Sequence, residues 1–181
     1  MVRRSRGRGA IVLMACLVAA VVFAAPATAK TYSVSGKQIA VDEDAGTFKM
    51  RGGLIGKWAI TSFQELETSP IYHGRGTELF RGCLDRRRDR SCKHDPSGTL
   101  SFNFDYWALF ASPDPESLVW SACWHPIVEG RGDFAGAQGV LMMVDTPTGK
   151  DVKTKYIGNV TLGSHAARRV ATAGVSRSRG C

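Results

Sequence analysis

The sequence predicts an all-β domain, an antiparallel β-barrel of about eight strands with minimal helix. Hydrophobic residues alternate with polar residues over 99–110, which is the period of a strand with one buried face. Turn-forming residues, as at 95–98, separate stretches of this kind at regular intervals. The third observation is the glycine-rich run 130–139. Its four glycines around Phe134 predict a bent, bulged hairpin with the ring pointing inward, and such bends let a sheet close on itself.

Each predicted strand is a stretch rich in apolar, β-branched or aromatic residues, and each ends at a turn segment. In chain order the predicted strands are 32–41, 47–52, 54–67, 72–82, 99–110, 117–125, 139–144 and 153–162. The segments between them that are rich in Gly, Pro, Asp and Ser are 42–46, 69–70, 95–98, 112–115 and 146–149.

The alternation is clearest in the two central strands. In 99–110 one face carries Leu100, Phe102, Phe104, Tyr106, Ala108 and Phe110, and the opposite face carries Ser101, Asn103, Asp105 and Trp107. In 117–125 one face carries Leu118, Trp120, Ala122 and Trp124, and the other carries Val119, Ser121, Cys123 and His125. The sequence leaves open which face of each strand points into the barrel.

The two ends of the chain differ from the predicted domain, which spans 30–164. Residues 1–29 resemble a secretory signal peptide: a basic start, an apolar run over 10–25, and an Ala-Thr-Ala motif at 27–29. We expect Sec-type export with cleavage after Ala29, and therefore a secreted protein that is not membrane-embedded once processed. Residues 165–181 are small, polar and basic, which predicts a disordered tail.

The basic charge belongs to these ends. The chain has 24 lysines and arginines against 16 acidic residues. Four arginines lie in the leader and four in the tail, so the predicted domain carries 16 basic and 16 acidic residues. A balanced domain does not favour nucleic-acid binding.

The expected mature chain has four cysteines, and an even number in an exported protein favours disulfides. Cys83 and Cys92 flank a short polar loop, so we expect a disulfide between them. Cys123 lies in an apolar predicted strand and Cys181 is the last residue. These two either pair with each other or stay free, with Cys123 buried and Cys181 exposed.

The Gly-x-Gly-x-Phe-x-Gly-Ala-x-Gly pattern at 130–139, the apolar strand after it and the final Tyr156-Ile-Gly158 strand resemble the allene oxide cyclase barrel-like superfamily. That group includes plant allene oxide cyclases and dirigent proteins, and its bacterial members are often small and exported. The resemblance is strongest over 125–163. It implies an antiparallel barrel with a central cavity and the dimers or trimers seen among the plant enzymes. No catalytic residue of those enzymes matches a position here, so the resemblance assigns none.

A set of aromatic residues in the central strands has the composition of an apolar ligand pocket. The candidate lining residues are Phe102, Phe104, Tyr106, Trp120 and Trp124, together with Met142 and Met143. The same residues also suit an ordinary barrel core.

Three carboxylates within predicted strands are candidate catalytic residues. Asp105 stands among aromatic residues, and Glu65 and Glu78 lie in other predicted strands. A carboxylate that faces the barrel interior has a raised pKa and can act as a general acid or base, whereas one on the outer face is solvated.

Other polar groups favour a structural interpretation. His125 follows Cys123 at a spacing of two, without further ligands nearby, so we expect a packed or hydrogen-bonded histidine. The loop after Cys83 contains Asp85 and Asp89, with Asp95 shortly beyond it. The four arginines of 84–91 lie among these carboxylates, so we expect no metal ion there.

We therefore expect a binding protein that holds a small apolar molecule in the barrel and needs no cofactor. Two alternatives remain open. One is a cofactor-independent cyclase or isomerase of allene oxide cyclase or dirigent type, which acts mainly by shaping its substrate. The other is a cell-envelope or partner-binding barrel that acts through its surface, using the arginines of 84–91.

Overall fold

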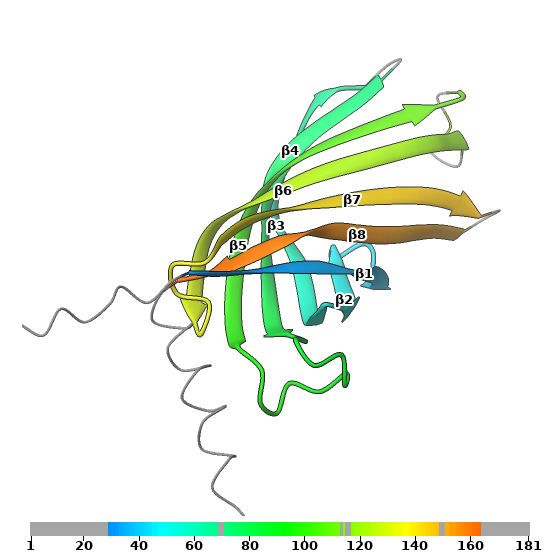
Figure 1. The fold of residues 1–181 in the computed structure, drawn as a ribbon. Coiled ribbons are helices and arrows are strands. Elements are labelled where there is room, and N and C mark those ends of the chain that lie inside the picture. Colours follow the sequence, from blue (N-terminus) through cyan, green and yellow to red (C-terminus); the bar gives the residue numbers. More distant parts are fainter. Residues whose placement is uncertain (1–28, 69–70, 113, 115–116, 149–150, 164–181) are drawn as a thin grey trace, which may run out of the picture.

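The computed structural model describes residues 29–68, 71–112, 114, 117–148 and 151–163. They form a closed antiparallel barrel in which each strand pairs with the next and β8 pairs with β1 (Figure 1). This confirms the predicted fold class. The strands are β1 (Lys30–Asp42), β2 (Thr47–Gly52), β3 (Leu54–Glu67), β4 (Ile71–Leu84), β5 (Ser97–Phe110), β6 (Leu118–Gly132), β7 (Gln138–Thr148) and β8 (Asp151–Leu162).

No α-helix occurs in the described part of the chain, and hence none that is long and apolar enough to cross a membrane. The predicted signal peptide falls almost wholly, and the predicted tail entirely, outside the described residues.

Strand β6 is longer than the sequence pattern predicts, since it continues past His125 to Gly132. The register explains the difference. Ser101 of β5 pairs with Glu129 and the next residue, Phe102, pairs with Ile127, so β6 bulges at this point. A bulge interrupts the alternation of inward and outward side chains. The sequence pattern that identifies a strand is therefore lost at this point, although the backbone pairing with β5 continues.

One end of the barrel is plugged by the hairpin between β6 and β7. Phe134 lies in that hairpin with its side chain fully buried, and its ring centroid is 6.3 Å from that of Phe80. Gly132 and Gly136 both adopt φ of 71°, a left-handed conformation that glycine adopts readily. The predicted bent hairpin with an inward phenylalanine is therefore confirmed. We call this the plugged end.

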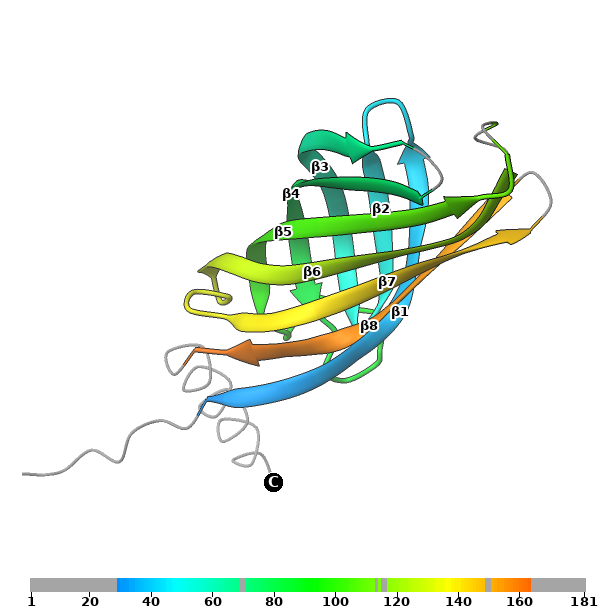
Figure 2. The same cartoon turned by 90° about the horizontal axis from the view of Figure 1, so that it is seen from above.

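The core begins beneath Phe134 and fills the interior toward the middle of the barrel. Its largest fully buried side chains come from β2, β3, β4, β5, β7, β8 and the plug: Met50, Leu54, Trp58, Phe80, Leu84, Leu100, Phe102, Phe134, Leu141 and Leu162. Trp58 stacks on Phe102 at 4.6 Å between centroids. In the view from above, the strands wrap around this shared interior, with β1 beside β8 (Figure 2).

The opposite end, where β5 and β7 finish, is less completely filled, and we call it the open end. Phe48, Ile60 and Tyr106 pack against the core there but remain partly exposed. Phe63 of β3 is 49% exposed although its ring stacks on that of Phe104. Figure 1 shows the strands spreading apart toward this end. Solvent therefore reaches the inner face of the barrel at the open end.

The predicted Cys83–Cys92 disulfide is present, with the two Cα atoms 5.5 Å apart. Cys83 is buried at the end of strand β4, one residue before Leu84, so the bond ties the β4–β5 loop to the barrel. Cys123 is a free buried cysteine. Its expected alternative partner, Cys181, lies outside the described residues.

Replacing both bonded cysteines with alanine is expected to lower the free energy of unfolding by roughly 2.5–3 kcal/mol, because the unfolded chain regains the freedom of a short loop. Urea unfolding of the wild-type and Cys83→Ala/Cys92→Ala proteins measures this difference. A Cys123→Ala protein that keeps the disulfide serves as a control for loss of a buried thiol. Equal stability of the wild-type and double-alanine proteins contradicts the prediction.

Candidate functional site

The strand β5 turns its aromatic face inward. Phe102 and Phe104 are buried and Tyr106 is partly buried, so all three expected lining residues on this strand face the interior. Asp105 lies on the opposite face with 61% of its side chain exposed, and its Oδ1 is 3.5 Å from His73 Nε2. This placement is contrary to the catalytic interpretation of Asp105, which requires an inward carboxylate.

On strand β6 the two candidate lining residues, Trp120 and Trp124, point away from the interior. Trp120 and Trp124 are 47% and 51% exposed on the outer surface, so they do not line the interior. The inward residues are Ser121, Cys123 and His125. The physical reason is volume: large rings from β3 and β5 already fill the space opposite β6, and smaller polar side chains fit against them.

Strand β7 follows the same alternation. Met143 is buried and pairs with inward Cys123, whereas Met142 pairs with outward Trp124. Only Met143 of the two methionines therefore belongs to the interior.

The centre of the interior holds an ion pair between β4 and β6. Glu78 and His125 are 6% and 1% exposed, and Glu78 Oε2 lies 3.0 Å from His125 Nε2. Glu78 faces inward because it pairs with Phe102 on the inner face of β5. Of the three candidate carboxylates, Glu78 is the one that the structure buries among the core side chains. The packed histidine expected at 125 is confirmed.

Aromatic rings surround this ion pair. The imidazole of His125 meets Trp58 edge-on at 5.6 Å between centroids, and Phe104 lies 6.0 Å from it. Three buried polar atoms here have no hydrogen-bond partner in the described structure: Trp58 Nε1, His125 Nδ1 and Glu78 Oε2, whose contact with His125 is not aligned as a hydrogen bond. An unpaired buried donor or acceptor costs about 1–3 kcal/mol.

A second polar cluster lies on the inner face nearer the open end. Asp145 of β7 accepts hydrogen bonds from Ser121 Oγ and Thr154 Oγ1, each at 2.5 Å. Tyr106 of β5 lies beside Ser121. Burial raises the pKa of its hydroxyl, the hydrogen bond with Ser121 lowers it, and the Asp145 carboxylate adds to the rise. Asp145 is therefore held by neutral donors from both neighbouring strands.

Cys123 lies between the two polar groups along β6. Burial raises the pKa of its thiol far above the ordinary value, and the Glu78 carboxylate raises it further. The thiol therefore stays protonated at neutral pH. A protonated buried thiol is a weak nucleophile, so Cys123 acts as a small packing residue.

Glu65 lies at the open end, where Tyr72 of β4 donates a hydrogen bond to its Oε2 at 2.9 Å. Burial and this hydrogen bond raise the pKa of Tyr72 to about 12. Glu65 itself is exposed. The structure does not bring Glu65 into the Glu78–His125 pair.

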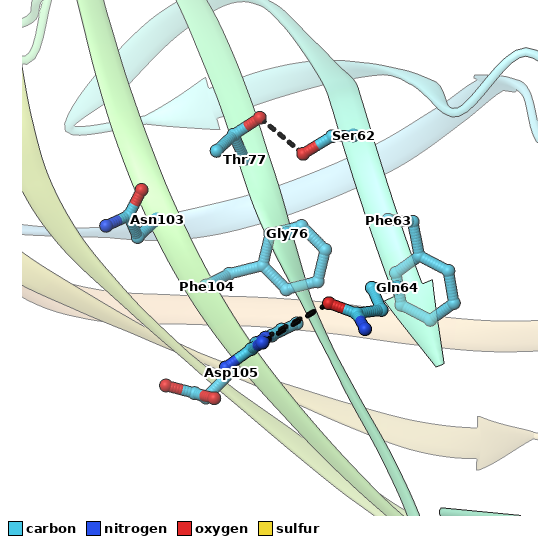
Figure 3. A pocket seen from close by; sticks show the side chains of 9 residues that line it. Ser62, Phe63, Gln64, Gly76, Thr77, Asn103, Phe104 and Asp105 are labelled. Carbon is cyan, nitrogen blue, oxygen red and sulfur yellow. Dashed lines mark hydrogen bonds between the residues drawn. The ribbon is translucent and has the colours of Figure 1, made fainter. Parts of the chain in front are cut away.

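A groove of about 520 Å³ opens across β3, β4 and β5 (Figure 3). It is lined by Ser62, Phe63, Gln64, Arg75, Gly76, Thr77, Asn103, Phe104 and Asp105. Gly76 leaves room for the ring of Phe104, which a Cβ at this position would meet at 2.7 Å. Most of the lining residues are exposed, whereas Phe104 is buried and its ring centroid lies 6.0 Å from that of His125.

Asp145 and Thr154 are among the interior residues that the sequence pattern does not single out as site residues, and Trp58 is another. Asp145 ends the apolar run 140–144, where a polar residue indicates a turn, but β7 continues to Thr148. Thr154 pairs with Asp145 across β7 and β8. The signal that could find them is the predicted pairing of these two strands around a short turn.

A search of protein-family models found none that matches this chain, and a search of curated proteins found no match either.

Proposed function

We propose that this barrel binds a small molecule that has an apolar body and a polar group, and that the molecule enters from the open end. The observation that carries the proposal is the Glu78–His125 pair, which is buried among aromatic rings although apolar side chains of similar size could fill the same space. Replacing a buried ion pair with packed hydrophobic residues is often neutral or stabilising. Stability alone therefore does not account for the pair.

The unpaired atoms define the chemistry of the polar group. In the charged form that pairs with Glu78, His125 carries a proton on Nδ1, so Nδ1 and Trp58 Nε1 are both hydrogen-bond donors. A ligand group that accepts hydrogen bonds suits this pair of atoms. Hydroxyl and carboxylic acid groups have this property, and the rings of Phe102 and Phe104 supply apolar contacts for the rest of the molecule.

An isomerase or cyclase is the second candidate, and the same pair favours it. A carboxylate and an imidazole 3.0 Å apart can exchange a proton with a bound molecule, which is general acid–base chemistry. In that case Glu78→Gln keeps a bound molecule but no longer converts it, and mass spectrometry of the released compound distinguishes the two functions.

Native and denaturing mass spectrometry of the folded protein, purified from its own source, tests the proposal. We expect a small-molecule adduct on the wild-type protein that disappears on denaturation. Replacing His125 with leucine removes a polar anchor, so the adduct population is expected to fall at least about tenfold, which corresponds to one lost hydrogen bond to a charged or buried group.

Asp105→Asn is the matched control, because this residue neighbours the inward aromatic residues of β5 but points outward. The control is expected to retain the adduct. A bare wild-type mass under native conditions, or equal adduct populations in the wild-type and His125→Leu proteins, contradicts a ligand held at the central pair.

A further inference from the structure

Three carboxylates converge in the loop that follows β4. Single oxygen atoms of Asp85, Asp89 and Asp95 all lie within 4.8 Å of one another. The disulfide between Cys83 and Cys92 encloses the first two, and Asp95 lies three residues beyond it. The sequence pattern predicts that the neighbouring arginines neutralise these carboxylates. In the structure most of these arginines point into solvent and do not contact them.

Two members of this carboxylate triad, the first and the last in the sequence, are buried. Asp85 and Asp95 are each 7% exposed, and the side chain of Asp95 is only 1% exposed. Asp95 Oδ2 is a buried oxygen without a hydrogen-bond partner in the described structure. A buried carboxylate oxygen without a donor is unfavourable unless a cation or another donor reaches it.

One arginine contacts the triad. Arg86 Nε donates to Asp95 Oδ1 at 3.0 Å, on the oxygen opposite the unpaired one. The side chains of Arg87, Arg88 and Arg90 are exposed, and in the described part of the chain they form no hydrogen bond or ion pair with the triad. The triad therefore carries three negative charges against one positive charge in contact.

Backbone donors orient the remaining oxygens. Asp85 Oδ1 and Oδ2 accept hydrogen bonds from the N–H groups of Asp89 and Arg90, and Asp89 Oδ1 accepts one from Ser91 N–H. These bonds hold Asp85 and Asp89 toward each other and leave lone pairs on all three carboxylates. The disulfide limits the movement of the loop, so little ordering is lost when a ligand binds.

We propose that Asp85, Asp89 and Asp95 bind a calcium ion. All the ligand atoms are carboxylate oxygens. Hard cations such as calcium are bound by oxygen ligands, whereas softer metals favour nitrogen and sulfur ligands. Calcium–oxygen distances of roughly 2.3–2.6 Å allow ligand oxygens to lie up to about 5 Å apart, which accommodates the observed separation. With three carboxylates and an adjacent arginine, we place the site in the weak class, with a Kd of about 10⁻⁴–10⁻³ M.

Isothermal titration calorimetry of Ca²⁺ into the oxidised, EDTA-treated full chain tests the site. The wild-type protein is expected to bind one Ca²⁺ saturably, and thermal unfolding is expected to shift to higher temperature in 10 mM CaCl₂ relative to EDTA. Asp95→Asn and the exposed-residue variant Asp89→Asn are each expected to weaken binding at least about tenfold. Asp89→Asn keeps the test decisive if Asp95→Asn fails to fold.

Two further variants separate a metal site from a structural ion pair. Arg86→Gln removes the contacting positive charge, so it is expected to strengthen Ca²⁺ binding, whereas the surface variant Asp105→Asn leaves it unchanged. The proposal is overturned if the wild-type protein shows no saturable binding up to 10 mM Ca²⁺. It is also overturned if Asp89→Asn and Asp105→Asn bind Ca²⁺ equally well.

Discussion

Replacing Glu78 with alanine is expected to lower the free energy of unfolding by about 3–5 kcal/mol, because it leaves buried His125 without its charged partner. The loss of the Glu78 side chain also opens space beside Phe102, with which Glu78 pairs across β4 and β5. Urea unfolding followed by far-ultraviolet circular dichroism measures the difference. Asn103→Ala is the matched control, because Asn103 is exposed and follows Phe102, the residue of β5 that pairs with Glu78; it is expected to lie within about 0.5 kcal/mol of the wild-type protein.

The double variant Glu78→Leu/His125→Leu gives the informative comparison. Both partners become apolar, so no unpaired buried charge remains and the unfolding free energy is expected to return to the wild-type value or exceed it by about 1–4 kcal/mol. The expected outcome is a stable barrel that no longer retains its ligand. If the double variant is as unstable as Glu78→Ala, the fold itself requires the pair, and this result contradicts a functional role for it.

Phe134→Ala is expected to lower the free energy of unfolding by about 3–5 kcal/mol. The ring is fully buried and contacts Phe80, so its removal leaves a cavity where the barrel is plugged. The backbone of the hairpin is held by its own hydrogen bonds, as from Ala137 N–H to the Phe134 carbonyl, so the site cannot collapse freely. The same unfolding assay measures the change.

Val128→Ala provides the comparison for the plug, because Val128 lies on β6 near the hairpin and is 54% exposed. Its substitution is expected to stay within about 0.5 kcal/mol of the wild-type protein. A Phe134→Ala protein with wild-type stability contradicts the role of this ring as a plug.

The sequence pattern predicts the strands well because the barrel repeats a simple rule. Turn residues separate eight alternating or apolar segments, and glycines allow the bend at Phe134. The end of β6 escapes prediction because a bulge opposite Ser101 and Phe102 shifts the alternation. Periodicity describes a strand only while its register is regular.

The orientation of β6 is harder to predict than its existence. Hydrophobicity alone favours burial of Trp120 and Trp124, but the interior opposite β6 is occupied by Trp58 and Phe104. Packing volume across the barrel decides which face turns inward, and this depends on strands far apart in sequence. The Glu78–His125 pair has the same origin, since the two residues are 47 positions apart in the sequence and meet because β4 and β6 both pair with β5.

The four tryptophans of the chain allow a molecule bound at the Glu78–His125 pair to be detected directly. Trp58 is fully buried at the polar pair, whereas Trp107, Trp120 and Trp124 lie on the outer surface. In two-dimensional ¹H–¹⁵N NMR spectra, each tryptophan indole N–H group gives one cross-peak. The protein as purified is compared with protein that has been denatured, stripped of bound molecules and refolded.

A ligand held at Glu78 and His125 predicts that the Trp58 indole cross-peak differs between the two samples and returns when the solvent extract of the protein is added back. The cross-peaks of the three outer tryptophans are expected to stay in place. Identical spectra, or changes confined to the outer tryptophans, contradict an interior binding site.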